Sequence, residues 1–186
     1  MANKELYEPA ARLYHVSFSV EGKVYLWGGA TQDLSSGHLD ELARHIEHFD
    51  PYLEIWSPLN TAGIPHPGLK YAACASHGEH VYTYGCAGTK AENTLSCLNL
   101  GVKIPTWSQI SPAEAVGGPM IKAWCGMVHF HDNKLAVIGG YGCPSGRIQP
   151  GSVFIRDPIA STSGTGWTNE IHIFDISQGS DIQDNY

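Results

Sequence analysis

Cysteine and histidine side chains gather in one short stretch of the sequence, where they could bind a metal ion. Cys74, His77 and His80 fall within seven residues, and Cys86 follows soon after. Thiolate and imidazole are ligands that zinc prefers, but a structural zinc site typically uses paired knuckles such as Cys-x2-Cys. No such pair occurs in this chain. We therefore predict no metal site and no bound cofactor.

The remaining candidates for catalysis are also sparse. His129 and His131 alternate along one strand-like segment, which is typical of packed or solvated imidazoles. The sequence contains no nucleophile elbow, no phosphate-binding glycine loop before a helix, and no His-Glu-x-x-His motif. We therefore predict that the chain is not an enzyme.

Composition restricts the classes of partner. The chain has 186 residues, 42% of them hydrophobic, and a net charge of -7 without any dense run of Lys or Arg. Nucleic acid and anionic membranes are therefore poor partners. The sequence has no run of about 18 apolar residues, so it predicts no membrane-spanning helix. Five scattered cysteines, an odd number, favour reduced thiols and a location in the cytoplasm or nucleus.

A repeat organises these residues. Each copy is an apolar strand, a polar turn, a second apolar strand and a glycine turn, and the copies run from His15 to Gly29, from Tyr71 to Gly88 and from Gly126 to Gly142. The equivalent glycines Gly28, Gly85 and Gly139 are 57 and 54 residues apart. This spacing is close to the period of about 50 residues found in kelch repeats.

Two outer strands should complete each copy. The first two copies carry tryptophans, Trp56 and Trp107, which we expect to pack between neighbouring repeats. The predicted boundaries are a lead-in over 1–11, a first unit over 12–60, a degenerate second over 61–112 and a third over 113–186. The third contains a long inserted loop, and the chain stops inside its last strand.

The glycine doublets carry the family resemblance. Gly28-Gly29 and Gly139-Gly140 end the second strand of their copies, where glycine permits positive φ and close backbone approach. In the second copy Cys86 follows Gly85 instead. The pattern resembles the kelch repeat, which implies an all-β, kelch-type β-propeller of about three four-stranded antiparallel blades. Three blades make an incomplete propeller, either an open arc or a fragment of a six-bladed ring.

The third unit has a more specific resemblance. Tyr141 and Gly142 follow the doublet, a long insertion comes next, and Gly166 to Asp175 reads GWTNEIHIFD. This resembles kelch domain-containing protein 2 and its close relatives, which are substrate receptors of cullin-RING ubiquitin ligases. The resemblance implies a pocket for the C-terminal tail of a client protein. Tyr141 and Trp167 match pocket positions, and Lys122 is the basic residue nearest to a pocket position that has no clean match here.

The resemblance therefore implies a protein-interaction module that binds client C-terminal peptides and, in a full-length form, an elongin–cullin ligase. A generic kelch scaffold for a cytoskeletal, GTPase or transcriptional partner remains an alternative, as does a non-functional truncated product. The open edges of three blades leave three readings: a fragment of a longer receptor, self-association of two copies into one ring, or a short product without a stable fold.

Overall fold

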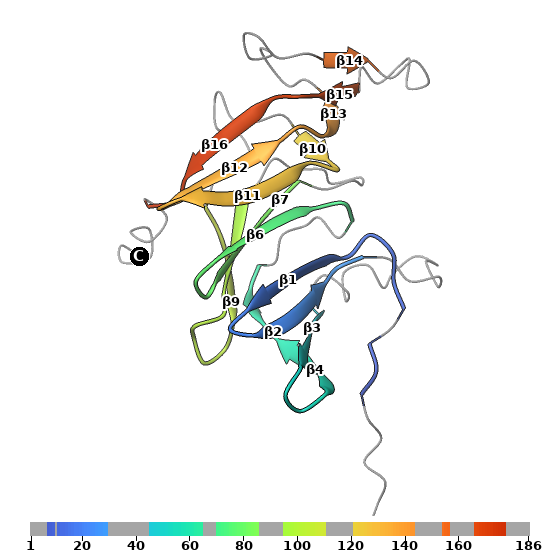
Figure 1. The fold of residues 1–186 in the computed structure, drawn as a ribbon, viewed down its shortest axis with the longest axis vertical. Coiled ribbons are helices and arrows are strands. Elements are labelled where there is room, and N and C mark those ends of the chain that lie inside the picture. Colours follow the sequence, from blue (N-terminus) through green and yellow to red (C-terminus); the bar gives the residue numbers. More distant parts are fainter. Residues whose placement is uncertain are drawn as a thin grey trace, which may run out of the picture.

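The computed structural model describes residues 7–9, 11–29, 45–64, 70–85, 95–110, 121–143, 154–156 and 166–177. These residues form β-strands joined by turns, and the described part of the chain contains no helix. Three sheets follow one another along the chain in an arc, with a smaller sheet beside the third (Figure 1). The predicted all-β fold is confirmed.

The first sheet is a four-stranded antiparallel meander. It contains β1 (Val16–Val20), β2 (Lys23–Trp27), β3 (His45–Asp50) and β4 (Ile55–Asn60), paired in that order. Buried and exposed residues alternate along β1, as expected of a strand with one covered face. Glu21 and Gly22 both have positive φ, and this allows the two-residue turn that joins β1 to β2.

The second sheet is complete despite its degenerate sequence. It contains β6 (Ala73–His77), β7 (His80–Tyr84), β8 (Leu95–Asn99) and β9 (Thr106–Gln109), all antiparallel. A short strand from the preceding connection, β5 (Ala62–Gly63), adds to β9 in parallel. This unit therefore forms a complete sheet although Cys86 stands in place of the second glycine of the doublet.

The third sheet has three described strands, β11 (Gly126–His131), β12 (Lys134–Ile138) and β16 (Ile171–Asp175). The fourth strand predicted near the C-terminus lies outside the described residues. The register between β11 and β12 shifts between His129 and His131, so β11 contains a bulge. Met127 lies before the bulge, directly opposite the buried Val137, and packs with it towards the second sheet.

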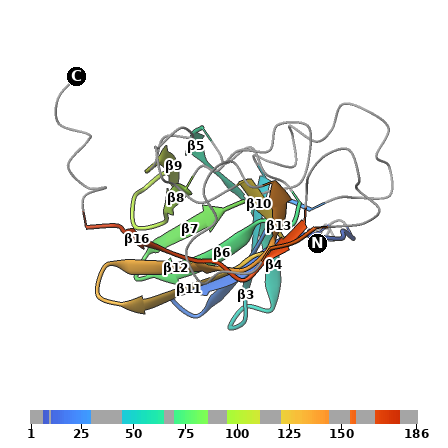
Figure 2. The same ribbon diagram turned by 90° about the horizontal axis from the view of Figure 1, so that it is seen from above.

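The segments on either side of the predicted inserted loop form a sheet of their own, together with one strand inside the loop and one strand from before β11. Its strands are β10 (Ile121–Ala123), β13 (Tyr141–Cys143), β15 (Gly166–Thr168) and β14 (Phe154–Arg156), hydrogen-bonded in that order. Residues 144–153 and 157–165 of the insertion lie outside the described part. Figure 2 shows β10 and β13 at one end of the strands of the third sheet.

Two apolar cores hold the sheets face to face. We call the face of each sheet that is turned towards the next sheet its front, and the opposite face its back. The front of the first sheet packs on the back of the second in a core that includes Phe18, Trp27 and Trp107. The front of the second packs on the back of the third through residues that include Tyr84, Leu135 and Val137. At both boundaries, therefore, the front of one sheet packs on the back of the next.

The two predicted packing tryptophans occupy different surroundings. Trp107 of β9 is only 3% exposed and lies between the first and second sheets, as expected. Trp56 of β4 has the equivalent position on the back of the first sheet, but no described sheet precedes it. Its described ring contact is with Phe49 of the neighbouring strand, at 5.2 Å between centroids.

Candidate binding surface

Five aromatic side chains form a continuous row of ring contacts at one end of the strands. The row joins Tyr14 to Tyr71 at 4.3 Å and Tyr71 to Trp124 at 4.2 Å between ring centroids. Trp124 then lies 5.7 Å from Tyr141 and 6.2 Å from Trp167, which contact each other at 5.1 Å. Tyr14, Trp124 and Trp167 are each about half exposed, at 48–50%. We call these five residues the aromatic row.

The backbone places the first three rings. Tyr14, Tyr71 and Trp124 each lie two residues before the first strand of their sheet, and each has a positive φ of 52–62°. A left-handed backbone at a bulky residue costs on the order of 1–3 kcal/mol, so it persists only where surrounding structure fixes it. Here the Tyr71 amide donates to the Tyr14 carbonyl and the Trp124 amide to the Tyr71 carbonyl, at 3.5 and 3.2 Å.

The glycine doublets allow the segments that carry Tyr14 and Trp124 to approach the backbone closely. Gly29 and Gly140 have φ of +90° and +110°. A Cβ on Gly29 would lie 2.8 Å from the Leu13 carbonyl oxygen, and one on Gly140 would lie 2.9 Å from the Cys125 Cβ. Leu13 and Cys125 are direct neighbours of Tyr14 and Trp124. The second glycine of each doublet is therefore needed for close approach of the segment that carries the aromatic residue.

A buried ion pair anchors the start of the row. The guanidinium of Arg12 lies 2.5 Å from the Glu47 carboxylate, and both side chains are at most 4% exposed. Arg12 also donates to the Gly28 carbonyl at 3.3 Å, and the Tyr7 hydroxyl donates to Glu47 at 2.8 Å. These bonds tie the segment before Tyr14 to both the first glycine doublet and β3.

The structure brings together two of the three predicted pocket residues. Tyr141 on β13 and Trp167 on β15 are directly opposite in the small sheet and in ring contact. Lys122 lies on β10, opposite Gly142, but its side chain is outside the described residues. Their role in binding a peptide stays a prediction. The positive φ predicted for the glycine doublets is present at Gly28, Gly29, Gly139 and Gly140, and Gly85 has it as well.

Polar groups lie within and beside the row. A side-chain hydrogen bond with Tyr14 raises the pKa of the Tyr71 phenol above its ordinary value, so the Tyr71 hydroxyl stays protonated at neutral pH. Lys70 directly precedes Tyr71 and is partly buried. The surface therefore offers aromatic faces with tyrosine hydroxyl groups, and a lysine is adjacent to it in the sequence.

Sequence reasoning missed Tyr14, Tyr71 and Trp124. A signal was present: aligning the segments before each first strand gives Arg-Leu-Tyr, Leu-Lys-Tyr and Lys-Ala-Trp, with an aromatic residue in the same place. Three aromatic residues at one repeat position, each two residues before the first strand of the repeat, would have predicted a surface shared by the three units.

The cysteines and histidines considered for metal binding are dispersed. Within the described ranges, no three Cys, His, Asp or Glu side chains form a group that could hold a metal ion, and Cys86 lies outside them. Cys74 donates to the Ser17 carbonyl at 3.5 Å, and burial raises its pKa to about 11. The His77 ring stacks on that of His129 at 4.0 Å, while His131 is exposed beside Asp132.

Comparisons with known proteins identify the fold. No family model matches the chain, and no curated protein matches it. Among solved structures the chain is similar to YjhT, a kelch β-propeller protein, with a TM-score of 0.60 and 16% identity over 91% of this chain. The fold is therefore a kelch-type β-propeller of incomplete extent, because the chain spans about half of YjhT, 54% of its length. The described residues include no helix long and apolar enough to cross a bilayer.

Proposed function

We propose that this chain is a peptide-recognition module and that the aromatic row receives an extended segment of a partner protein. The observation that carries the proposal is the continuity of the row, in which successive sheets each supply a ring and three of the rings are about half exposed. Aromatic residues dominate binding hot spots because they bring a large contact area at a small entropic cost.

The proposed ligand is the C-terminal tail of a client protein. Support comes from the resemblance of the segment from Gly139 to Asp175 to ligase substrate receptors, and from the position of Tyr141 and Trp167 within the row. Lys70 directly precedes Tyr71 and Lys122 lies two residues before Trp124 in the sequence, and in this proposal such a lysine pairs with the terminal carboxylate. In a longer protein with further blades, this surface would serve an elongin–cullin ligase as its substrate-recognition part.

Peptide titration tests the proposal. Fluorescently labelled peptides ending in glycine are titrated with the protein, beside the same peptides with an amidated terminus. We expect the free carboxylate to bind roughly tenfold tighter or better, because amidation removes the charge. Equal affinities would reject carboxylate capture and favour a generic kelch scaffold.

A matched pair of variants tests the surface itself. Trp124→Ala should weaken peptide binding by roughly tenfold or more, as expected of a central aromatic contact. Tyr52→Ala is the control, because Tyr52 is 90% exposed in the turn between β3 and β4 and outside the row. If Trp124→Ala binds as tightly as the control variant, the aromatic row is not the binding surface.

A further inference from the structure

Two sheet faces in the described structure lie open, one at each end of the arc. The front of the third sheet exposes large apolar side chains, each 42–53% accessible: Val128, Phe130, Ile138, Ile171 and Ile173. The alternate residues Leu135 and Val137 point to the second sheet and are fully buried. At the other end, the back of the first sheet presents Val24, Leu26, Phe49 and Trp56.

The two closed boundaries show which groups meet when such faces pack. At the first boundary Trp27, on the front of the first sheet, contacts Trp107 on the back of the second, at 5.0 Å between ring centroids. At the second boundary Tyr84 on a front face contacts Phe174 on a back face at 5.7 Å. A front residue at the end of the second strand therefore meets an aromatic residue of an outer strand.

The open faces carry the equivalents of the first pair. Ile138 precedes Gly139-Gly140 as Trp27 precedes Gly28-Gly29, and it lies on the open front. Trp56 occupies the fourth strand of the first sheet as Trp107 occupies that of the second, and it lies on the open back. The surfaces that the fold buries twice within one chain are thus each present once more without a described partner sheet.

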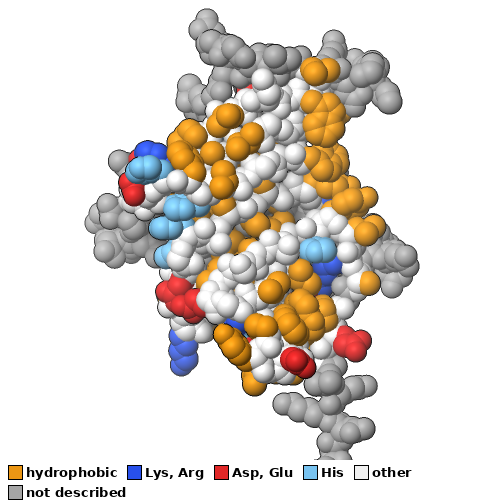
Figure 3. Space-filling model, viewed as in Figure 1, with side chains coloured by type: hydrophobic (Ala, Val, Ile, Leu, Met, Phe, Trp, Pro, Cys, Tyr) orange, Lys and Arg blue, Asp and Glu red, His pale blue; other side chains and the backbone are white. Residues whose placement is uncertain are grey.

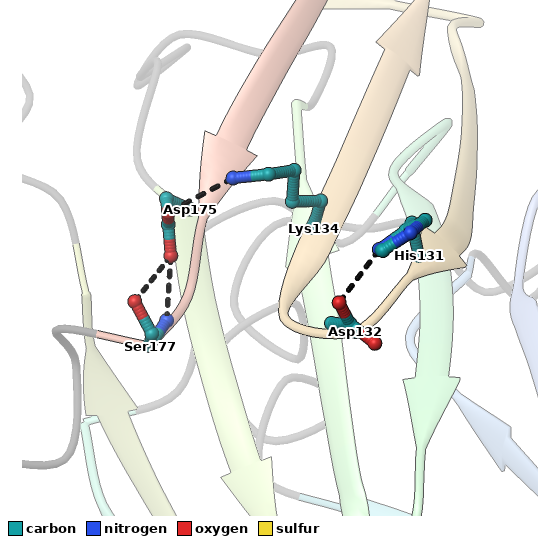
Figure 4. Close-up of polar contacts among 5 residues, drawn as sticks. All are labelled: His131, Asp132, Lys134, Asp175 and Ser177. Atoms are coloured by element: carbon teal, nitrogen blue, oxygen red, sulfur yellow. Dashed lines mark hydrogen bonds and ion pairs between the residues drawn. The ribbon is translucent and has the colours of Figure 1, made fainter.

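The two open faces lie on the same side of the molecule, and their charged residues already have partners within the chain. Figure 3 shows hydrophobic side chains over β11, β12 and β16 and, on the same side of the molecule, over β2 and β3. The charged residues of the open front, Lys134 and Asp175, pair with each other at 3.0 Å, so packing this face would leave neither without a partner (Figure 4). At the other face, Arg12 and Tyr7 cover Glu47 and leave Val24 exposed.

We propose that a second copy of this chain covers both faces, so that two chains form one closed ring. The front of the third sheet of each copy packs on the back of the first sheet of the other, and a two-fold axis relates the two contacts. Ile138 of one copy then lies against Trp56 of its partner. One chain matches 54% of the length of YjhT, so two copies supply about the number of residues in one such propeller.

Mass and a charge substitution test the proposal. Light scattering on the 186-residue chain should give twice the single-chain mass of 20.2 kDa. Ile173→Glu places a carboxylate in the contact and should raise the dimer dissociation constant roughly tenfold or more. Ile104→Glu is the matched control, because Ile104 is exposed outside both faces. A monomer, which leaves the faces to further blades of a longer chain, overturns the proposal, as does a larger open assembly.

Cross-linking tests the arrangement without placing a charge in the contact. A chain with Ile138→Cys is mixed with a chain carrying Trp56→Cys, and a short thiol cross-linker is added to the mixture. We expect cross-linked dimers in the mixture above the level given by either variant alone or by the wild-type chain. Dimers formed equally by Ile138→Cys alone indicate front-to-front contact, and no cross-link above wild type indicates no contact at these faces. Either result overturns ring closure.

Discussion

The indole of Trp27 lies 5.0 Å from that of Trp107, centroid to centroid, across the boundary between the first two sheets. Trp27 is fully buried and Trp107 nearly so. This pair joins residues 80 positions apart in the chain, and both rings belong to the core between the first two sheets.

Trp107→Ala should lower the free energy of unfolding by about 3–5 kcal/mol, because it empties an aromatic site between two sheets. Urea denaturation monitored by far-UV circular dichroism measures the loss. Trp56→Ala is the matched comparison, and both variants are made in the Ile173→Glu chain so that contacts between copies do not contribute. Trp56→Ala should cost less, since Trp56 is only partly buried in the single chain. Equal costs would show that Trp107 does not act through the boundary between the sheets.

Trp167→Ala should behave in the opposite way. Its side chain is 50% exposed, so its removal should change the free energy of unfolding by less than about 1 kcal/mol. Peptide affinity should nevertheless fall, because the ring belongs to the aromatic row. Paired denaturation and anisotropy measurements on one preparation check both. A strongly destabilised variant with unchanged affinity would move Trp167 from the binding surface to the supporting structure.

Gly29→Ala should destabilise the protein by roughly 2–4 kcal/mol, since the new Cβ meets backbone atoms of the segment before β1. Gly22→Ala, in the turn between β1 and β2, is the control. Gly22 also has positive φ, but a Cβ there meets nothing within 4 Å, and the cost should be only about 1 kcal/mol. The difference between the two variants measures the close approach alone. Gly29→Ala should also weaken peptide binding, because it displaces Tyr14.

Asp175 should make the edge of the third sheet sensitive to acid. Hydrogen bonds from Ser177 and from the Lys134 ammonium group lower its pKa from 3.8 to about 2 (Figure 4). Because the folded-state pKa lies below the ordinary value, this contribution is fully present above pH 4 and is lost as the pH falls towards 2. Asp175→Asn should therefore lower the melting temperature slightly at pH 6, with the difference from wild type vanishing near pH 2. A constant difference would contradict the assignment.

Local patterns predicted the repeated part of the fold well. Alternating apolar residues, polar two-residue turns and the glycine doublets each act over a few residues, so the hairpins and the positive φ values could be predicted from the sequence. The position of Trp107 followed from the repeat. The partial burial of Trp56 did not, because it depends on what lies beyond the first sheet.

Features that depend on contacts between units were missed. The bulge in β11 shifts the register of one strand, and no residue type in Gly126–His131 marks it. The small sheet forms because β10, from before the first strand of its unit, pairs with β13 after the glycine doublet. Tyr14, Tyr71 and Trp124 were passed over because each resembles an ordinary residue before a strand. Their arrangement as one row depends on hydrogen bonds between neighbouring units.

Those hydrogen bonds join backbone atoms only, so they do not require an aromatic side chain at any of the three positions. Substituting one ring would therefore alter the chemistry at a single step while its neighbours kept their places. Duplication or loss of a blade would lengthen or shorten the row by one unit. With the row as the proposed binding surface, ligand preference would be modular and could diversify position by position without redesign of the scaffold.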